Sequence, residues 1–200
     1  MPLSEKIILA SSSIRRIRLL EDLGIPFDPM SPEVDEDKVL ADYGLSLSCP
    51  ELAMKLARLK AMSLANKHPD RLCLGADTLV TINGRVLGKP KNKEQATEYL
   101  RMLSGTYHQV ITGFSWICLK DSFDVTDHTM TGVTVVKLSD GDIKEYLSRE
   151  NVLDASGAYK IQSFFRRYIK KISGSFHNVV GLPVSQVYYY YWQYNEKTGK

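Results

Sequence analysis

The chain has 200 residues, 44% of them hydrophobic, and a formal net charge of +3 at pH 7. This length and composition predict one globular domain over residues 1–200, and the small charge gives no support for a nucleic-acid partner. Three cysteines without metal-ligand or redox spacing, and apolar runs too short for a signal peptide or membrane span, indicate a cytoplasmic chain with no membrane partner.

Strands and helices alternate in the first half of the chain. Lys6–Ala10 is an isoleucine-rich run typical of a buried strand, and apolar residues recur at helical spacing from Ile14 until Gly24. Phe27–Met30 is predicted to be extended, and Pro29 and Pro32 indicate either a sheet edge or a loop. The elements expected next are an acidic loop over 33–37, a helix from Pro50 to His68, a strand over Leu72–Ile82, a hairpin turn at Asn83-Gly84 and a helix over Lys91–Leu103.

The second half predicts further strands and helices. The expected elements are strands over Val110–Leu119 and Thr129–Leu138 around a polar turn near Asp121–Asp127, a helix over Ser139–Ser148, extended segments at Ala158–Ile161 and Tyr168–Ile172, and a helix from Pro183. The whole order predicts an α/β or α+β fold around a mixed sheet. The aromatic cluster Tyr188–Trp192 predicts either a homodimer face or a helix packed on its own core.

The strand-to-helix junction Ser11–Arg16 is the first candidate site. Backbone N–H groups and the dipole at a helix start attract anions, and serine hydroxyls add donors. Arg15 and Arg16 offer the bidentate geometry that suits phosphate oxygens. The simpler alternative is a serine N-cap followed by a solvated basic face, and the pattern alone favours neither.

Asp77 and two lysines are the next candidates. Asp77 ends an apolar run, and a carboxylate in that place can bind a metal or take a proton from water. Lys89, in the constrained loop Gly88-Lys89-Pro90, and Lys60, on the second long helix, can each reach a phosphate. The alternatives are a turn-capping aspartate and two solvated lysines.

Carboxylates and one amide complete the candidates. Glu33, Asp35, Glu36 and Asp37 form an acidic run that could hold a hard cation such as Mg²⁺, although a solvated loop explains it as well. Gln162 offers both a donor and an acceptor to the edge of a base, with a surface strand residue as the alternative.

Taken in order, these segments resemble the Maf family of nucleotide pyrophosphatases. Each motif is weak alone, but the ordered set is specific and covers nearly the whole chain. The matching segments are ILASSSIRR (Ile8–Arg16), PEVDE (Pro32–Glu36), LARLKA (Leu56–Ala61), GADTLV (Gly75–Val80), LGKP (Leu87–Pro90), LSG (Leu103–Gly105), HQVITG (His108–Gly113), GAYKIQ (Gly157–Gln162) and NVVGLP (Asn178–Pro183).

The resemblance implies a Maf/ITPase-like α/β fold: a mixed, curved sheet with flanking helices, and two lobes around a deep cleft. It implies an enzyme that cleaves a nucleoside triphosphate between the α and β phosphates, releasing pyrophosphate, with Mg²⁺ or Mn²⁺ as cofactor. Non-standard or surplus nucleotides are the usual targets in the family, and some members are linked to restraint of cell division.

The resemblance also implies a role for each candidate residue. The implied roles are general base for Asp77, metal-associated carboxylate for Glu36, phosphate contact for Lys60, Lys89, Ser11, Ser13 and Arg16, and base specificity for Arg15, Thr78 and Gln162. The last three residues are similar to those of the branch that acts on dTTP and UTP.

The chain departs from the family pattern at Ile14, where proline is usual, and at Ala155, Lys160 and Ser163 around Gln162. These departures motivate a second hypothesis, a nucleotide- or nucleic-acid-binding regulator without catalysis. The basic, aromatic stretch Phe164–Lys171 suits that hypothesis as well, although a strand with one basic face explains it too. Retention of Asp77, Lys60 and Lys89 favours the enzyme.

Overall fold

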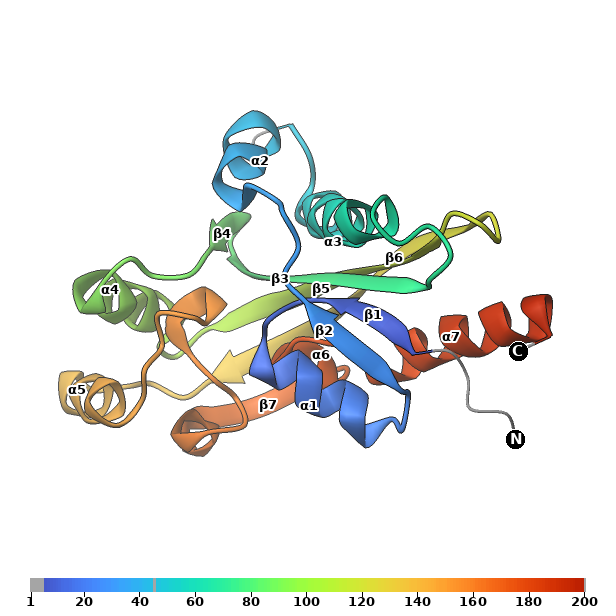
Figure 1. Cartoon of the computed structure of the whole chain (residues 1–200). Helices are drawn as coiled ribbons and strands as arrows, with labels where there is room; N and C mark the ends of the chain where they lie inside the picture. The colour runs from blue at the N-terminus through green and yellow to red at the C-terminus, as the bar shows by residue number, and fades with distance from the viewer. Residues whose placement is uncertain (1–5, 45, 200) are drawn as a thin grey trace. The chain divides into compact units, whose positions relative to one another are not determined.

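A computed structural model describes residues 6–44 and 46–199, and these residues form strands, α-helices and two short 3₁₀ helices (Figure 1). The strands are β1 (Ile7–Ala10), β2 (Phe27–Met30), β3 (Cys73–Ile82), β4 (Arg85–Leu87), β5 (Tyr107–Cys118), β6 (Phe123–Val135) and β7 (Ile169–Ser173). The helices are α1 (Ile14–Asp22), α2 (Glu36–Tyr43), α3 (Cys49–Ala65), α4 (Lys93–Leu103), α5 (Asp140–Arg149), η1 (Ser156–Ala158), η2 (Phe164–Tyr168), α6 (Phe176–Val180) and α7 (Val184–Thr198).

The strands form one mixed sheet in the order β2-β1-β3-β5-β6-β7, with β4 paired to β3. Strand β1 runs parallel to both β2 and β3, whereas β3 with β4 and β6 with β7 are antiparallel pairs. The predicted α/β class with a mixed sheet and flanking helices is therefore confirmed. Strand β2 lies at the sheet edge as expected, because Pro29 has no N–H to give to a second neighbour.

The chain divides into two compact units, which are described separately. The first unit contains Met1–Asp77, Thr112–Thr129 and Gly181–Lys200, and the second contains Thr78–Ile111 and Met130–Val180. Strands β3, β5 and β6 contribute residues to both units. The predicted arrangement of two lobes around a cleft stays a prediction.

In the first unit, α3 and α7 cover opposite faces of β5 (Figure 1). Gly113 faces α3, because a Cβ atom at this position would lie 2.5 Å from the backbone nitrogen of Met54. Its neighbour Phe114 points the other way and packs on Tyr190 of α7, with 5.8 Å between the ring centroids. The Trp116 indole follows on the same face and donates a hydrogen bond to the Val187 carbonyl. The two-residue period of the strand thus separates the two helices.

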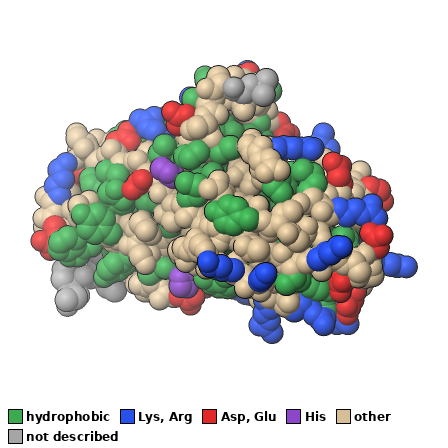
Figure 2. All heavy atoms as spheres, turned by 180° about the vertical axis from the view of Figure 1, so that it is seen from behind, with side chains coloured by type: hydrophobic (Ala, Val, Ile, Leu, Met, Phe, Trp, Pro, Cys, Tyr) green, Lys and Arg blue, Asp and Glu red, His purple; other side chains and the backbone are tan. Residues whose placement is uncertain are grey.

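Helix α7 has one packed face and one exposed face. Val187 and Tyr194 are buried, whereas Tyr188, Tyr189 and Trp192 are each about half exposed. Figure 2 shows hydrophobic side chains gathered over α7 on the far side of the view in Figure 1. Packing of the helix on its own core therefore accounts for part of the aromatic cluster, and the homodimer stays a prediction. No helix within residues 6–44 and 46–199 is long and apolar enough to cross a membrane.

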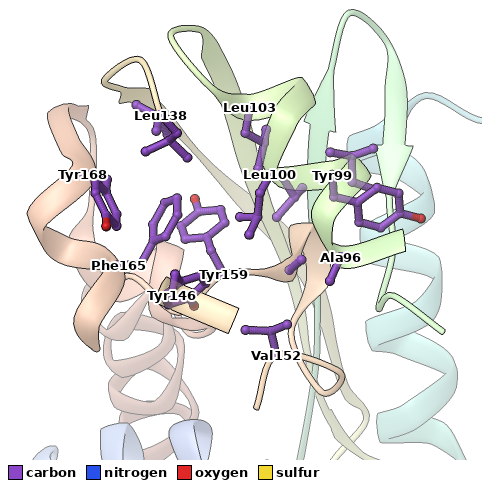
Figure 3. Packing of buried hydrophobic residues seen from close by; sticks show 14 of the residues in the cluster. Ala96, Tyr99, Leu100, Leu103, Leu138, Tyr146, Val152, Tyr159, Phe165 and Tyr168 are labelled. Carbon is purple, nitrogen blue, oxygen red and sulfur yellow. The ribbon is translucent and has the colours of Figure 1, made fainter. Parts of the chain in front are cut away.

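The second unit has a core in which aromatic rings from different elements meet (Figure 3). Phe165 of η2 is fully buried, and its ring lies 5.0 Å from that of Tyr146 in α5 and 4.8 Å from that of Tyr159. Leu100 and Leu103 of α4 join the same cluster. This core supports the segment that carries Gln162.

Three sequence-based expectations for local structure were wrong. The polar turn expected near Asp121–Asp127 is shorter, because β6 already begins at Phe123. The acidic run is only partly a loop, since Asp35 caps α2 by accepting a hydrogen bond from the Lys38 amide, and Glu36 is the first residue of the helix. Ala158–Ile161 is extended only in part: Tyr159 has extended angles, but Ala158 ends η1 with a positive φ angle of 60° and Ile161 lies in a turn, so no strand forms.

Candidate active site

In the first unit, helix α3 and the part of strand β3 that ends at Asp77 bring the central charged residues together. Gly75 has no side chain, so the backbone of α3 packs closely on β3 beside Ala61. Lys60 precedes Ala61 on the helix, and Asp77 lies two residues after Gly75, on the same face of the strand. The close packing thus presents Lys60 to Asp77.

Lys60 is held between two carboxylates. Its Nζ lies 2.5 Å from Asp77 Oδ1 and 2.7 Å from Glu36 Oε1. The side chains of Lys60 and Asp77 are only 6% and 10% exposed, whereas that of Glu36 is 37% exposed. A nearly buried ammonium therefore joins a nearly buried carboxylate to one that solvent can reach.

Arg16 belongs to the same charged group. Its Nε donates a hydrogen bond of 2.9 Å to the Gly181 carbonyl, which fixes the side chain, and its charge interacts with those of Asp77 and Glu36. Burial lowers the pKa of the Arg16 guanidinium, an effect that the two carboxylates oppose and neighbouring Arg15 reinforces. The first turn of α1 thus brings positive charge to the carboxylate pair.

The turn before α1 is shaped by its serines. Ser11 is buried, and its Oγ accepts a hydrogen bond of 3.1 Å from the Ser13 amide. Ser13 occupies the N-cap position of α1, but its side chain makes no capping hydrogen bond among the described residues. Ile14, where the family pattern has proline, begins the helix and is 66% exposed. The serine-cap alternative therefore accounts for the position of Ser13 and leaves its hydroxyl unexplained.

Three predicted site residues belong to the second unit. Thr78 lies in β3 and is half-buried, Lys89 is exposed in the loop after β4, and Gln162 is exposed in a turn between η1 and η2. The loop around Gln162 contains two of the departures from the family pattern. Lys160 forms an ion pair of 2.7 Å with Asp154, and Ser163 Oγ donates to the Lys160 carbonyl.

Sequence reasoning missed two contributions of the backbone. The Gly181 carbonyl accepts a hydrogen bond from Arg16, which is 165 positions away in the sequence. Ser156 and Gly157 donate hydrogen bonds to the backbone carbonyls of Thr78 and of Gly88, the residue before Lys89. Glycines at 157 and 181 were the only local signal, and alone they indicate turns. In the acidic run, Glu33 pairs with Lys67 at 2.6 Å, so Glu36 is the member that contacts the central lysine.

Comparisons with known proteins agree with the motif order. A family model described as Maf-like protein matches residues 6–191. A dTTP/UTP pyrophosphatase of Alkaliphilus oremlandii is 41% identical over 90% of this chain and 91% of its own length. One of Bacillus anthracis is 42% identical over 91% and 92% of the two chains. A solved structure of the Staphylococcus aureus Ham1 protein, at 15% identity, covers 82% of this chain and 93% of its own, with a TM-score of 0.43, which is too distant to define a function.

Proposed function

The chain belongs to the Maf family, and we propose that it hydrolyses dTTP or UTP, or a modified relative, to the monophosphate and pyrophosphate. The observation that carries this proposal is the nearly buried Lys60 held between Asp77 and Glu36. The names of relatives about 40% identical over nine-tenths of the chain support the substrate class.

Asp77 is the proposed general base. Its carboxylate takes a proton from a water molecule as the water oxygen forms a bond to the α-phosphorus. The anhydride P–O bond breaks, and its electron pair leaves with pyrophosphate. Lys60 supports this role because its Nζ holds Asp77 Oδ1 in one place, and a positioned base works better than a mobile one.

The phosphate grip is assigned to the turn before α1 and to Arg16. The helix start, the Ser11 and Ser13 hydroxyls and the guanidinium together offer N–H and O–H donors for phosphate oxygens. Lys60 adds an ammonium that can donate to an incoming phosphate while it keeps its carboxylate partners. Such hydrolysis depends mainly on positioning and charge, and these residues supply both.

The carboxylates fit a divalent cation such as Mg²⁺ or Mn²⁺. No group of three or more His, Cys, Asp or Glu suited to a metal occurs within residues 6–44 and 46–199. Mg²⁺ in nucleotide sites, however, is commonly held by one or two carboxylates together with substrate phosphates. Glu36 and Asp77 both border the same Lys60 nitrogen and provide two such carboxylates. When bound, the cation would neutralise charge on the phosphates.

Base recognition is assigned to Arg15, Thr78 and Gln162, and a further phosphate contact to Lys89. Gln162 is exposed, so its amide is available to the edge of a base. The chain carries the Arg, Thr and Gln that resemble the branch acting on dTTP and UTP.

Pyrophosphate release from a panel of triphosphates, with and without Mg²⁺ or Mn²⁺, tests the proposal. The wild-type protein should prefer dTTP or UTP, and Asp77→Asn should lose about 10²–10⁴-fold in rate. Asp124→Asn is the matched control, because Asp124 pairs with Arg58 at the surface. Nearly wild-type hydrolysis by Asp77→Asn would remove Asp77 from its role. No release from any triphosphate would favour the non-catalytic binder instead.

A further inference from the structure

Two consecutive residues of the second unit, Ser156 and Gly157, bond to the backbone beside two of the proposed substrate-binding residues. Ser156 Oγ donates a hydrogen bond of 3.1 Å to the carbonyl of Thr78 itself. The Gly157 amide donates one of 3.1 Å to the carbonyl of Gly88, the residue before Lys89. We name this pair the brace. It ties one short segment to both ends of the β3–β4 hairpin region.

Packing around Gly157 leaves no room for a side chain. A Cβ atom at this position would lie 2.8 Å from Val80 Cγ1, and the φ angle of +70° disfavours any other residue. Ala158 follows with a φ angle of +60°. The backbone therefore turns sharply against β3 at the place where the two hydrogen bonds form, and this turn directs the chain toward Gln162.

The segment between the brace and Gln162 is anchored independently by two hydrogen bonds. The hydroxyl of Tyr159 lies 2.8 Å from Nε2 of the buried His108. The Lys160 amide donates a hydrogen bond of 3.0 Å to the Tyr146 hydroxyl. Ile161 is also buried, so exposed Gln162 follows directly on a fixed backbone.

We propose that the brace holds Thr78, Gly88 and the segment leading to Gln162 as one rigid recognition surface, and that Ser156 is a positioning residue for the base of the nucleotide. Neither brace residue needs to touch the substrate, because Ser156 acts through the backbone of Thr78 and Gly157 through the backbone of Gly88, which precedes Lys89. The inference rests on the proposed function, since Thr78, Lys89 and Gln162 are substrate contacts only within it. It adds the Ser156 hydroxyl to the determinants of base choice.

Ser156→Ala tests the proposal because it removes one hydrogen bond and keeps the backbone. Losing a neutral hydrogen bond of this kind should raise KM for the preferred triphosphate about three- to tenfold and reduce its preference over CTP, with kcat nearly unchanged. Ser148→Ala is the matched control, since exposed Ser148 Oγ donates a hydrogen bond of 2.7 Å to the Glu145 carbonyl, three residues earlier in α5. Ser156→Thr, which keeps a hydroxyl, should restore most of the lost affinity.

Amide hydrogen exchange provides a readout that needs no activity. Ser156→Ala should exchange faster than both wild type and Ser148→Ala in peptides covering Thr78–Gly88 and Gly157–Gln162. Exchange unchanged in Ser156→Ala would overturn the brace whatever the activity. Unchanged KM and base preference in an active protein, or equal effects of the two alanine variants, would overturn its role in recognition. Failure of the wild-type protein to release pyrophosphate from any triphosphate would instead contradict the proposed function.

Discussion

Gly75 of β3 lies so close to Ala61 of α3 that an added Cβ atom would be 2.5 Å from the Ala61 amide nitrogen and 3.0 Å from the Ala61 Cβ. Neither atom can move without moving the helix, because one belongs to its backbone and the other is bonded to it. Lys60 is the preceding residue of that helix. The separation of 2.5 Å between Lys60 Nζ and Asp77 Oδ1 therefore depends on the missing side chain of Gly75.

Gly75→Ala should push α3 away from β3 and draw Lys60 away from Asp77. We expect a loss of about 1–3 kcal/mol in the free energy of unfolding, as for other overpacked cores, and a fall in hydrolysis. Urea denaturation followed by circular dichroism measures the first, and pyrophosphate release the second. Gly141→Ala is the control, because its added Cβ would meet nothing nearer than 3.6 Å. Equal stability of the two variants would contradict the role given to Gly75.

The Lys60–Asp77 ion pair should behave as a nearly buried one. Lys60→Met removes the ammonium that pairs with the Asp77 carboxylate, which is only 10% exposed, and this should cost about 3 kcal/mol in the free energy of unfolding. Lys60→Met combined with Asp77→Leu should regain most of this stability, because an apolar pair often replaces a buried ion pair at little cost. Both the single and the double variant should lack hydrolytic activity, because each has lost a residue of the proposed active site. If the double variant were less stable than Lys60→Met alone, the unpaired Asp77 charge would not be the cause of the stability loss in Lys60→Met.

Metal removal should abolish hydrolysis. Chelation with EDTA is expected to stop pyrophosphate release, and added Mg²⁺ or Mn²⁺ to restore it. Glu36→Gln should raise the metal concentration needed for half-maximal rate about tenfold, because one carboxylate ligand is lost while Asp77 remains. Glu33→Gln is the control, since Glu33 pairs with Lys67 instead. Full activity of the wild-type protein in EDTA would rule out the proposed cofactor.

Local rules predicted much of the fold. The predicted hairpin turn at Asn83-Gly84 is confirmed, since both residues adopt positive φ angles, 51° and 76°, which these residue types tolerate best. Helix α3 begins with Pro50 in its first turn and carries buried leucines at helical spacing, so its sequence contained both signals. Helix α2 was missed because none of its described residues is buried, and it therefore has no apolar stripe to recognise.

The candidate site was only partly predictable from the sequence, because it depends on contacts between elements that are distant in the sequence. Resemblance to a family marked Lys60, Asp77 and Glu36, but their meeting depends on the pairing of β3 with β1 and on the packing of α3 against β3. No spacing in the sequence encodes such a tertiary contact. Ser156 had no signal at all, since a serine hydroxyl bonded to a distant carbonyl is visible only once β3 is in place.

His108 should make the folded protein sensitive to acid. Its side chain is buried, Nε2 lies 2.8 Å from the Tyr159 hydroxyl, and Nδ1 is buried without a hydrogen-bond partner among the described residues. Burial lowers the pKa of His108 to about 4 from its ordinary value of 6.5. The folded protein therefore keeps this imidazole neutral at pH values where the unfolded chain already protonates it.

The direction of the effect on stability follows from proton binding. Between pH 6.5 and about 4 the unfolded chain binds the extra proton and the folded protein does not, so stability falls as the pH falls through this window. The full shift corresponds to about 3 kcal/mol. His108→Gln keeps a polar partner for Tyr159 without a titrating group, and should lose correspondingly less stability between pH 7 and pH 4.5. Urea denaturation of both proteins at several pH values measures the difference. Parallel pH profiles would show that His108 contributes nothing to the acid sensitivity.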